Sequence, residues 1–383
     1  MVAEGTWRPA RVLVDTAAIG RNVAKLRALC APAAICAVVK ANGYSHGAVL
    51  AAEAALAAGA AGLAVALVDE GVELRDAGIT APILILAEPH PSAMEACFHH
   101  HLTPTVASAA GVDAAIAAAS ERGGKNPVHL KIDTGMHRVG AAPEEAVGLA
   151  ARVHACPTLT LEGCYTHFAV ADGVDDAATA FTEHQLATFD AVLFEMEGLG
   201  VVPTLRHAAN TAGAIRFPAS RYDMVRCGIG IYGYAPAPDV DATLAAAGLS
   251  PLEPALSLTA TVSAVHHLPA GARPSYGRRR ALPQPATVAT VPLGYADGVP
   301  RSFFDHDLHV LIGGVRRPLA GAVTMDQIVV DCGADPVAVG DDVVLIGRQG
   351  DAVITANDWA ERLSTIHYEV LCRLSVRVPR EAQ

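Results

Sequence analysis

The sequence predicts an α/β protein: a (β/α)8 TIM-type barrel followed by a C-terminal, mostly antiparallel β domain. Short apolar runs alternate with Ala-rich helical stretches through the first two thirds of the chain, as in parallel strands that are joined by helices. Eight such runs precede residue 240, and this number in a span of about 250 residues is typical of a closed barrel. After residue 255 the pattern changes to alternating β-type runs that Gly and Pro interrupt, which indicates an antiparallel domain. We therefore expect one domain over residues 1–240 and a second over 241–383.

The predicted barrel strands are separated by stretches long enough for a helix. From the apolar runs we place the strands at residues 35–39, 62–66, 82–86, 103–106, 128–132, 159–166, 204–207 and 224–228. The clearest helical patterns between them cover residues 47–58, 143–154 and 177–197. An open doubly wound sheet has the same strand–helix alternation, so it is the alternative to a closed barrel.

The elements outside the barrel follow from the same patterns. A further strand over 11–14 ends at Asp15, a suitable N-cap for a helix over 16–29, and the pattern leaves open whether this strand packs with the C-terminal domain. The Pro-rich sequences APAPDVD and LSPLEP, between residues 235 and 254, indicate a connector. Beyond it we expect strands within 257–267, 286–296, 309–315, 327–332 and 341–347, and a helix over 356–363.

The composition excludes several classes of protein. Lys and Arg number 28 against 39 Asp and Glu, a formal net charge of −11, which argues against a nucleic-acid-binding protein because such proteins carry basic surfaces. With 52% apolar and 17% charged residues, the chain has the composition of a folded protein and not of a disordered one. The longest uncharged apolar stretch, 54–68, is interrupted by Gly59 and Gly62 and is shorter than the roughly 20 residues of a membrane-spanning helix.

Other features predict the compartment and argue against a metal. The N-terminal segment carries Glu4 and Arg8 and has no apolar region, so we expect no secretory signal. The eight cysteines lack a CxxC pair, which is typical of reduced thiols in a cytoplasmic protein and does not match a zinc site. The consecutive side chains of His99–His101 point in different directions, so we expect them in a solvated loop and expect no bound metal.

Polar side chains gather at the predicted carboxyl ends of the barrel strands, where barrel enzymes hold their catalytic groups. Lys40 directly follows the apolar run ICAVV, so its amine is expected at the mouth of the barrel. A lysine there can simply reach solvent, or it can form a Schiff base if burial or neighbouring cations lower its pKa. The other strand ends supply Asp133, Arg138, His167, His207, Asn210 and Arg226. This clustering predicts an active site.

A glycine-rich segment after the last predicted barrel strand, CGIGIYG at 227–233, contains the spacing G-x-G-x-x-G. A dinucleotide-binding fingerprint requires a helix to follow, but Pro236 and Pro238 exclude one there. The loops after the seventh and eighth strands of a barrel commonly bind phosphate through backbone N–H groups. Here those loops carry Asn210–Thr211 and Gly228, so we expect them to hold the phosphate of a cofactor.

The run AVVKANGYSHG at 37–47 closely resembles the segment that binds pyridoxal phosphate in alanine racemases. Further matches occur in the order of that family: HLKIDTGMHRVG (129–140), THFA (166–169), HAANTAGA (207–214), MVRCGIGIYG (224–233), SYG (275–277), LGYADG (293–298), AGAVTMDQ (320–327) and IHYEVLCRLSVRVPR (366–380). The resemblance covers nearly the whole chain. It implies the fold-type III architecture, in which a barrel precedes a β domain.

The resemblance implies roles for the matching residues in a homodimer that binds pyridoxal 5′-phosphate. Lys40 would hold the cofactor and act as one catalytic base, and Tyr276 from the second subunit would be the opposite base. Arg226 would face the ring nitrogen of the cofactor, with His167 hydrogen-bonded behind it. The phosphate would be held by residues from both predicted domains: Tyr44, Asn210, Thr211, Gly228, Ile229 and Tyr368.

The same resemblance implies a substrate site. Arg138 and the backbone of Met325 would receive the substrate carboxylate, and Tyr295 and Asp326 would line the entrance or support these groups. In part of the family the lysine that matches Lys131 carries a carbamate formed with carbon dioxide, which orients the arginine. An ordinary ion pair with an acid is the alternative for Lys131.

The sequence departs from the family pattern in places. Gly43 and Ser45 stand where Ala and Gly are more usual, and Thr211 replaces a Ser while keeping the hydroxyl. His137 stands where Gly is usual, directly before Arg138. This departure bears on the site because the imidazole could alter the position or charge of the arginine.

The implied activity is the interconversion of L-alanine and D-alanine, which supplies D-alanine for peptidoglycan. A proton must leave one face of Cα and return to the other, and Lys40 and Tyr276 provide a base on each face. Arg226 does not readily give up its proton, so electron withdrawal stays weak and transamination is suppressed. Racemisation of another small amino acid such as serine is the first alternative.

Two other classes share part of this architecture. A fold-type III amino-acid decarboxylase generally places an acid near the ring nitrogen and lacks the pair of Arg226 and Tyr276. A non-enzymatic carrier of pyridoxal phosphate resembles the barrel alone, and the size of the segment 255–383 argues against that function.

Overall fold

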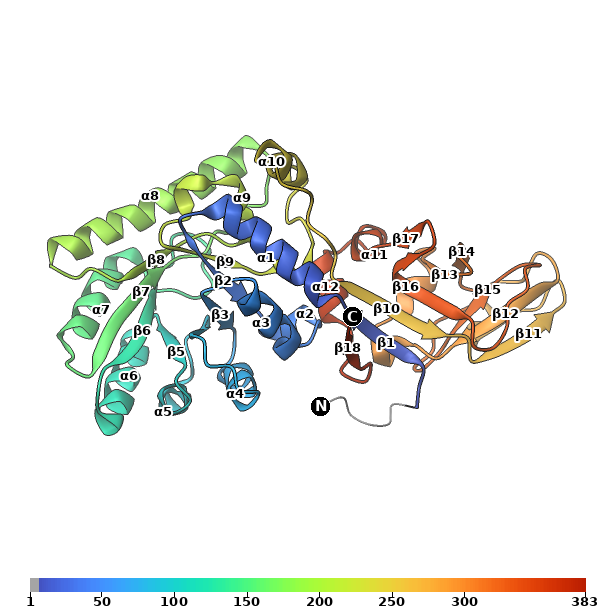
Figure 1. Ribbon diagram of the computed structural model, residues 1–383, viewed down its shortest axis with the longest axis horizontal. Helices are drawn as coiled ribbons and strands as arrows, with labels where there is room; N and C mark the ends of the chain where they lie inside the picture. Colours follow the sequence, from blue (N-terminus) through green and yellow to red (C-terminus); the bar gives the residue numbers. More distant parts are fainter. Residues whose placement is uncertain (1–6) are drawn as a thin grey trace. The chain divides into compact units, whose positions relative to one another are not determined.

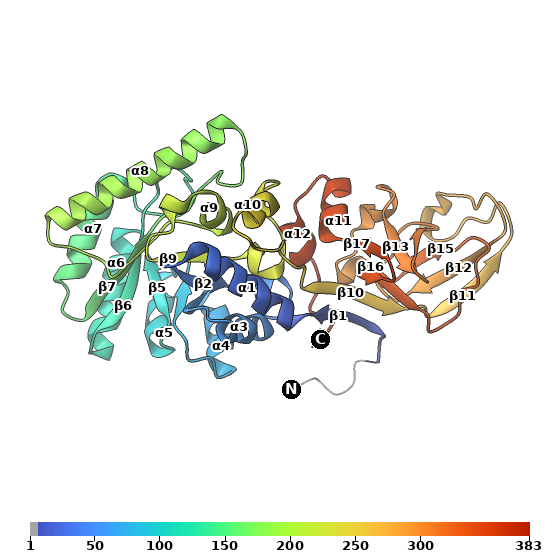
Figure 2. The same ribbon diagram turned by 45° about the horizontal axis from the view of Figure 1, so that its top comes forward.

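The computed structural model describes residues 7–383, which divide into two compact units (Figures 1 and 2). The barrel unit comprises residues 17–43 and 48–254, and the β unit comprises the segment up to residue 16 together with residues 44–47 and 255–383. Glu4 and its neighbours lie outside the described residues, so the expectation about a secretory signal stays a prediction.

The barrel unit contains eight parallel strands, hydrogen-bonded in the order β8-β7-β6-β5-β4-β3-β2-β9. The two edges of this sheet meet, because Asp223 N–H donates to Arg206 O at 3.1 Å and Arg226 N–H donates to Ala209 O at 3.0 Å. The predicted barrel is therefore confirmed, and the open doubly wound alternative is wrong. The strands are β2 Ala34–Val38, β3 Gly62–Val65, β4 Ile83–Ile85, β5 Thr103–Val106, β6 Asn126–Lys131, β7 Leu159–Tyr165, β8 Leu205–His207 and β9 Met224–Cys227.

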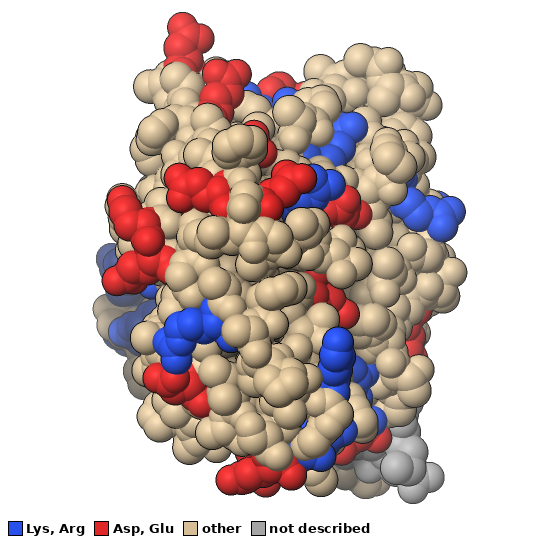
Figure 3. All heavy atoms as spheres, turned by 90° about the vertical axis from the view of Figure 1, so that its left-hand side faces the viewer, with Lys and Arg blue, Asp and Glu red and all other residues tan. Residues whose placement is uncertain are grey.

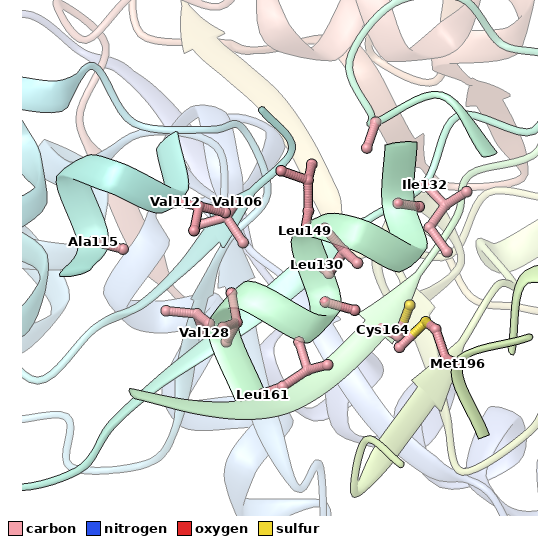
Figure 4. Close-up of a cluster of buried hydrophobic side chains, with 14 of the residues drawn as sticks. Val106, Val112, Ala115, Val128, Leu130, Ile132, Leu149, Leu161, Cys164 and Met196 are labelled. Atoms are coloured by element: carbon pink, nitrogen blue, oxygen red, sulfur yellow. The ribbon is translucent and has the colours of Figure 1, made fainter. Parts of the chain in front are cut away.

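Helices follow the strands and lie around the outside of the sheet (Figure 1). Polar caps start two of the long ones: Ser108 accepts a hydrogen bond from Gly111 N–H, and Asp175 accepts one from Ala178 N–H. In Figure 4 the side chains of β5, β6 and β7 meet those of the covering helices in a buried apolar cluster that includes Val106, Val112, Val128, Leu130, Leu149, Leu161 and Met196. The helices are α1 Thr16–Cys30, α3 Ala48–Ala57, α4 Val68–Asp76, α5 Met94–His99, α6 Ala109–Arg122, α7 Pro143–Ala155, α8 Asp176–Gly198, α9 Thr211–Arg216 and α10 Val240–Ala246.

The end of the barrel unit differs from the expected boundary at residue 240, because residues 241–254 belong to this unit. The Glu253 carboxylate holds them in place by pairing with Arg21 at 2.7 Å and Lys25 at 2.6 Å. Asn22 Nδ2 also donates to Glu253 O at 2.8 Å. The expected connector contains the helix α10. Pro238 is compatible with this helix because it lies before the first turn, so its missing N–H breaks no hydrogen bond within the helix.

The β unit contains two sheets. The larger has the strand order β14-β13-β16-β10-β1-β18, with β17 paired to β16, and the smaller has the order β11-β12-β15. The segment 257–267, expected as one run, forms β10 and β11, which lie in different sheets. The first strand, β1, pairs antiparallel with β10 and parallel with β18, so it is part of the larger sheet.

The elements of the β unit agree with the β-type runs after residue 255. The strands are β1 Ala10–Val14, β10 Leu256–Thr261, β11 Ala264–Leu268, β12 Ala286–Val291, β13 His309–Ile312, β14 Val315–Pro318, β15 Ile328–Asp331, β16 Asp342–Gln349, β17 Ala352–Ile354 and β18 Arg380–Ala382. The helices are α11 Ala356–Leu363, with the bounds the sequence predicts, and α12 His367–Cys372.

On the side of the molecule that Figure 3 presents, acidic and basic side chains are interspersed, so this face carries no large patch of one charge. Across residues 7–383, no helix has both the length and the apolar content needed to cross a membrane. All eight cysteines are free thiols.

Candidate active site

Lys40 begins a strained turn at the carboxyl end of β2. It opens the short helical segment α2, Lys40–Tyr44, inside which Ala41, Asn42 and Gly43 have φ values of 53, 53 and 60°. Tyr44 and Ser45 continue the left-handed conformation with φ values of 50 and 66°. Each residue other than Gly in this region costs about 1–2 kcal/mol. Such a run persists only where its surroundings hold it, and strain of this kind is often found at functional sites.

Glu70 is one of the groups that hold this turn, and sequence reasoning missed it. Its Oε1 accepts a hydrogen bond from Ala41 N–H at 2.6 Å, and its Oε2 accepts bonds from Ala66 N–H at 2.8 Å and Leu67 N–H at 3.1 Å. The carboxylate therefore ties the residue after Lys40 to the end of β3. Its position at the third residue of α4, where an acid commonly caps a helix, is the signal that could have identified it.

Arg226 lies in β9 and is only 3% exposed. Its Nη1 donates to His207 Nδ1 at 2.8 Å and to His207 O at 3.1 Å. Its Nη2 donates to the carbonyl oxygens of Thr166 at 2.7 Å and Ala208 at 3.0 Å, and to His167 Nδ1 at 3.2 Å. Within residues 7–383 no carboxylate contacts the guanidinium, and no acceptor bonds its Nε–H. This group is a buried cation with one donor still available.

The two histidines that contact Arg226 are held neutral. Burial, aided by Arg226, keeps the pKa of His167 well below its usual value. The same two causes, with His129, act on the pKa of His207. Both imidazoles therefore accept hydrogen bonds from Arg226 without adding charge.

Cations gather around Lys131 in β6. Burial, together with the charges of Arg226, Arg138 and Lys40, lowers its pKa to about 8, while Asp133 opposes them. Lys131 Nζ donates to Leu86 O at 3.4 Å and lies 5.4 Å from the centroid of the Tyr165 ring. The expected acid partner is absent from its hydrogen bonds in the described chain.

The Asp133 carboxylate instead accepts hydrogen bonds from the backbone of the loop that follows β6. Its Oδ1 accepts hydrogen bonds from Gly135 N–H and His137 N–H, both at 3.0 Å. Burial acts to raise the pKa of Asp133, but these backbone bonds and the neighbouring His137 outweigh it, and the pKa lies below its usual value. The carboxylate therefore shapes the loop before Arg138 and is not among the hydrogen-bond partners of Lys131.

The loops after β8 and β9 meet at Thr211. Asn210 caps α9 by accepting from Gly213 N–H at 2.9 Å. Thr211 Oγ1 accepts from Gly228 N–H at 3.1 Å and from Gly230 N–H at 3.5 Å. A Cβ added at Gly230 would lie 2.5 Å from Thr211 Cγ2, so the loop that begins at Gly228 and Ile229 reaches Thr211 only because a glycine is present.

The remaining predicted residues belong to the β unit. Tyr276, Tyr295 and Met325 are 72%, 41% and 53% exposed, unusually high values for large apolar side chains. Asp326 accepts a hydrogen bond from Arg377 Nη2 at 2.7 Å. Tyr368 lies next to Tyr44, with 6.2 Å between the ring centroids.

The expected histidine loop lies away from these groups. His99 ends α5, and His101 lines a surface pocket of about 390 Å³ together with Arg122, Lys125 and residues that precede β6. None of the predicted site residues lines this pocket. In residues 7–383 no three His, Cys, Asp or Glu side chains converge as metal ligands.

Comparison with known proteins agrees with the resemblance in both units. The model of the alanine racemase N-terminal domain matches residues 14–236, and that of the alanine racemase C-terminal domain matches residues 255–382. The alanine racemase of Symbiobacterium thermophilum is 43% identical over 379 residues, which cover 97% of each chain.

Solved structures give the same result. A crystal structure of alanine racemase from Bacillus anthracis with bound L-Ala-P has a TM-score of 0.92 and 38% identity, covering 99% of this chain and 96% of that one. A histidine racemase from Leuconostoc mesenteroides has a TM-score of 0.89 and 29% identity, covering 99% of both chains. The resemblance of the motifs is thus confirmed along the full length, and the chain belongs to the alanine racemase family, a family of amino-acid racemases.

Proposed function

We propose that this enzyme interconverts L-alanine and D-alanine with pyridoxal 5′-phosphate as its cofactor. The observation that supports a cofactor is the set of cations in the barrel unit. Lys131 and Arg226 are buried, and the charges of Arg226, Arg138 and Lys40 act on Lys131 with only Asp133 opposing them. Uncompensated buried charge is costly, and an anionic cofactor with an anionic substrate would offset it.

The residues of the barrel unit fit this cofactor. The Arg226 Nε–H has no acceptor in the described chain and suits an unprotonated ring nitrogen. The loops after β8 and β9 meet at Thr211, whose hydroxyl accepts from Gly228 and Gly230 and keeps its own proton to donate to a phosphate. The residues proposed to hold the cofactor are Lys40, Tyr44, His167, Asn210, Thr211, Arg226, Gly228, Ile229 and Tyr368. When bound, the cofactor withdraws electrons from the substrate Cα and so weakens its C–H bond.

Two bases would then exchange the Cα proton. Lys40, fixed by the strained turn after β2, takes or returns the proton on one face, and Tyr276 does so on the other. The exposed Tyr276 side chain fits a residue that is supplied to a second subunit, so we propose a homodimer in which each site receives the partner subunit's Tyr276. Arg226 keeps its proton, so the charge left on Cα is quickly neutralised and transamination is suppressed.

The substrate would be held by its carboxylate. Arg138 would bind this group, with the backbone of Met325 as a second contact, and Tyr295 and Asp326 would line the approach. Glu70 would act indirectly, by keeping Lys40 in position. The product, D-alanine, would serve peptidoglycan synthesis in the cytoplasm, a reducing compartment that fits the eight free thiols.

A racemase of another amino acid is the second candidate, and the histidine racemase among the similar structures favours it. The test is direct: the purified enzyme is incubated with pyridoxal phosphate and with L-alanine, L-serine or L-histidine, and the enantiomers are separated. We expect equilibration of alanine to be fastest. Faster equilibration of another amino acid would replace the proposed substrate, and no equilibration of any would contradict the function.

The shared site has its own test. Inactive Lys40→Ala subunits are mixed with inactive Tyr276→Phe subunits under conditions of subunit exchange. In each mixed dimer one site carries both substitutions and the other carries neither, so partial activity should return. Proven exchange without recovery would contradict the exchange of Tyr276 between subunits.

A further inference from the structure

A hydrogen-bond chain leads from a partly exposed carboxylate to Arg226. Arg226 Nη1 lies 2.8 Å from His207 Nδ1, His207 Nε2 lies 2.9 Å from His129 Nδ1, and His129 Nε2 lies 3.2 Å from Glu162 Oε2. The Glu162 side chain is 38% exposed, whereas that of His129 is 4% exposed. The four residues come from β9, β8, β6 and β7, which are neighbours in the barrel sheet.

The chain can run in only one direction. A guanidinium only donates, so His207 Nδ1 must accept and its proton lies on Nε2. That proton is donated to His129 Nδ1, which leaves the His129 proton on Nε2, facing a carboxylate that only accepts. Both imidazoles must be neutral for this arrangement, and burial together with Arg226 keeps the pKa of His207 well below its usual value.

The backbone is shaped to build this chain. The register between β6 and β7 shifts so that Val128 faces Leu161 while His129 faces Gly163. Glu162 is therefore the extra residue of a β-bulge, a feature that redirects a side chain. A Cβ added at Gly163 would lie 2.4 Å from His129 Nδ1, so the glycine leaves room for the imidazole.

We propose that Glu162 is a positioning residue that acts on Arg226 through His129 and His207. Every direct partner of Arg226 in the described chain is uncharged, and burial makes its cationic form less stable. The chain ends on a negative charge, which stabilises the positive charge on Arg226 and keeps its proton in place. This inference rests on the proposed function, because the group that would otherwise take the proton is the ring nitrogen of the cofactor.

The test removes the charge and keeps the shape. Glu162→Gln retains a carbonyl oxygen that can accept from His129, and the matched control Glu197→Gln makes the same charge change on an exposed residue of α8. In the loaded enzyme we expect the ratio of transamination to racemisation to rise on the order of fivefold for Glu162→Gln, the size expected of one partly screened charge. The control should match the wild type. An unchanged ratio in Glu162→Gln would overturn the inference.

A second readout is independent of activity. In wild-type protein labelled with 15N-histidine, the resonances of His129 and His207, assigned by single substitutions, should report protons on Nε2 of both rings. A proton on Nδ1 of either ring would overturn the chain, even if the Glu162→Gln variant failed to fold. Wild-type protein without racemase activity would contradict the proposed function, whereas an active wild type with an unchanged ratio in Glu162→Gln contradicts this inference alone.

Discussion

The two units bury charge in opposite ways. In the barrel unit, Arg226 is 3% exposed and Lys131 is 6% exposed, and their side chains bond to carbonyl oxygens and imidazoles. In the β unit, the Asp297 side chain is fully buried at 0% and accepts hydrogen bonds from Arg8 at 2.8 and 3.1 Å. Arg377 Nε lies 3.6 Å from the same carboxylate. One unit leaves cations without an acid, and the other surrounds an acid with cations.

This difference separates functional charge from structural charge. A buried ion that finds its partners within the protein is complete, and breaking the pair costs stability. A buried cation without a carboxylate destabilises the fold unless an anion from outside the chain binds there. The comparison therefore predicts that substitutions of the buried cations and their neighbours in the barrel unit lower activity, whereas substitutions at Asp297 lower the free energy of unfolding.

The largest effect is expected at Lys40. Lys40→Ala removes one of the two proposed bases and the amine that holds the cofactor, so racemisation should fall by at least about 10³-fold, within the range of a positioned acid–base group. The melting temperature should change little, because Lys40 opens a turn that other groups hold. The assays are chiral separation of alanine and thermal unfolding.

Lys125→Ala is the matched control for Lys40→Ala, since it removes an exposed lysine of the same unit. It should leave activity unchanged. A Lys40→Ala enzyme that still binds cofactor through dialysis and racemises alanine would show that another group is the base.

Asp297→Asn should act on stability. It removes the charge that Arg8 and Arg377 share in a buried site, and breaking such a pair typically costs about 3–5 kcal/mol. Urea unfolding measures this loss, and the turnover of the folded fraction should stay within about twofold of the wild type. The control is Asp305→Asn, whose carboxylate pairs with Arg279 on the surface, where a pair is worth about 0–1 kcal/mol. Equal losses at both positions would break the distinction between the two kinds of charge.

Lys131 gives a prediction with a defined pH dependence. Burial, followed by the charges of Arg226 and Arg138, lowers its pKa to about 8, against about 10.4 in an unfolded chain. Between these values the unfolded state binds more protons, so the free energy of unfolding rises with pH across that window, and Lys131 destabilises the fold below it. Lys131→Met should therefore raise the free energy of unfolding at pH 7 by up to about 3 kcal/mol. It should also flatten the rise between pH 8 and 10.

A decrease in the free energy of unfolding of Lys131→Met would indicate that Lys131 is modified. If Lys131 carries the carbamate that the family resemblance implies, Lys131→Met would remove a favourable negative charge and destabilise the protein. A 13C-carbon dioxide label that is retained by the wild type and lost in Lys131→Met would then identify the modification. An increase in the free energy of unfolding would indicate a buried amine, and a decrease would indicate a carbamate.

Much of the fold was predictable because it rests on local patterns. The apolar runs place all eight barrel strands within about two residues of their observed ends, and the helix over 356–363 has its predicted bounds. The division of 257–267 between two sheets was not predictable, because alternation indicates a strand but not its partner. The boundary after residue 254 depends on ion pairs between Glu253 and residues far away in the sequence.

Part of the candidate site can be proposed from the same kind of local pattern. Lys40 stands out because it directly follows an apolar run, and Arg226 and Arg138 stand out as cations within a predicted strand and in the loop after one. Glu70 and Glu162 act across strands, so their partners depend on register and on a bulge that leaves no clear local pattern. The role of Tyr276 rests on resemblance alone, since its sequence neighbours are ordinary turn residues.

The smallest expected effect is at His137, where the sequence departs from the family. His137 has a φ of 54°, which explains why Gly is usual there. The His137 imidazole is 84% exposed and its Nδ1 lies 3.6 Å from Asp133 Oδ2. His137 is therefore a surface residue paired with Asp133, unlike the buried cations Lys131 and Arg226. His137→Gly should therefore raise the free energy of unfolding by less than about 1 kcal/mol, because relief of the left-handed conformation is partly offset by the lost pair.

Ser364→Gly is the matched control, because Ser364 has a φ of 53° at the end of α11 and no ion pair. Its free energy of unfolding should rise slightly more than that of His137→Gly. Urea unfolding of both variants measures the difference, which is the worth of the His137–Asp133 pair. A loss of racemase activity of more than about tenfold in His137→Gly would show that the imidazole acts on Arg138 and that His137 belongs to the functional residues.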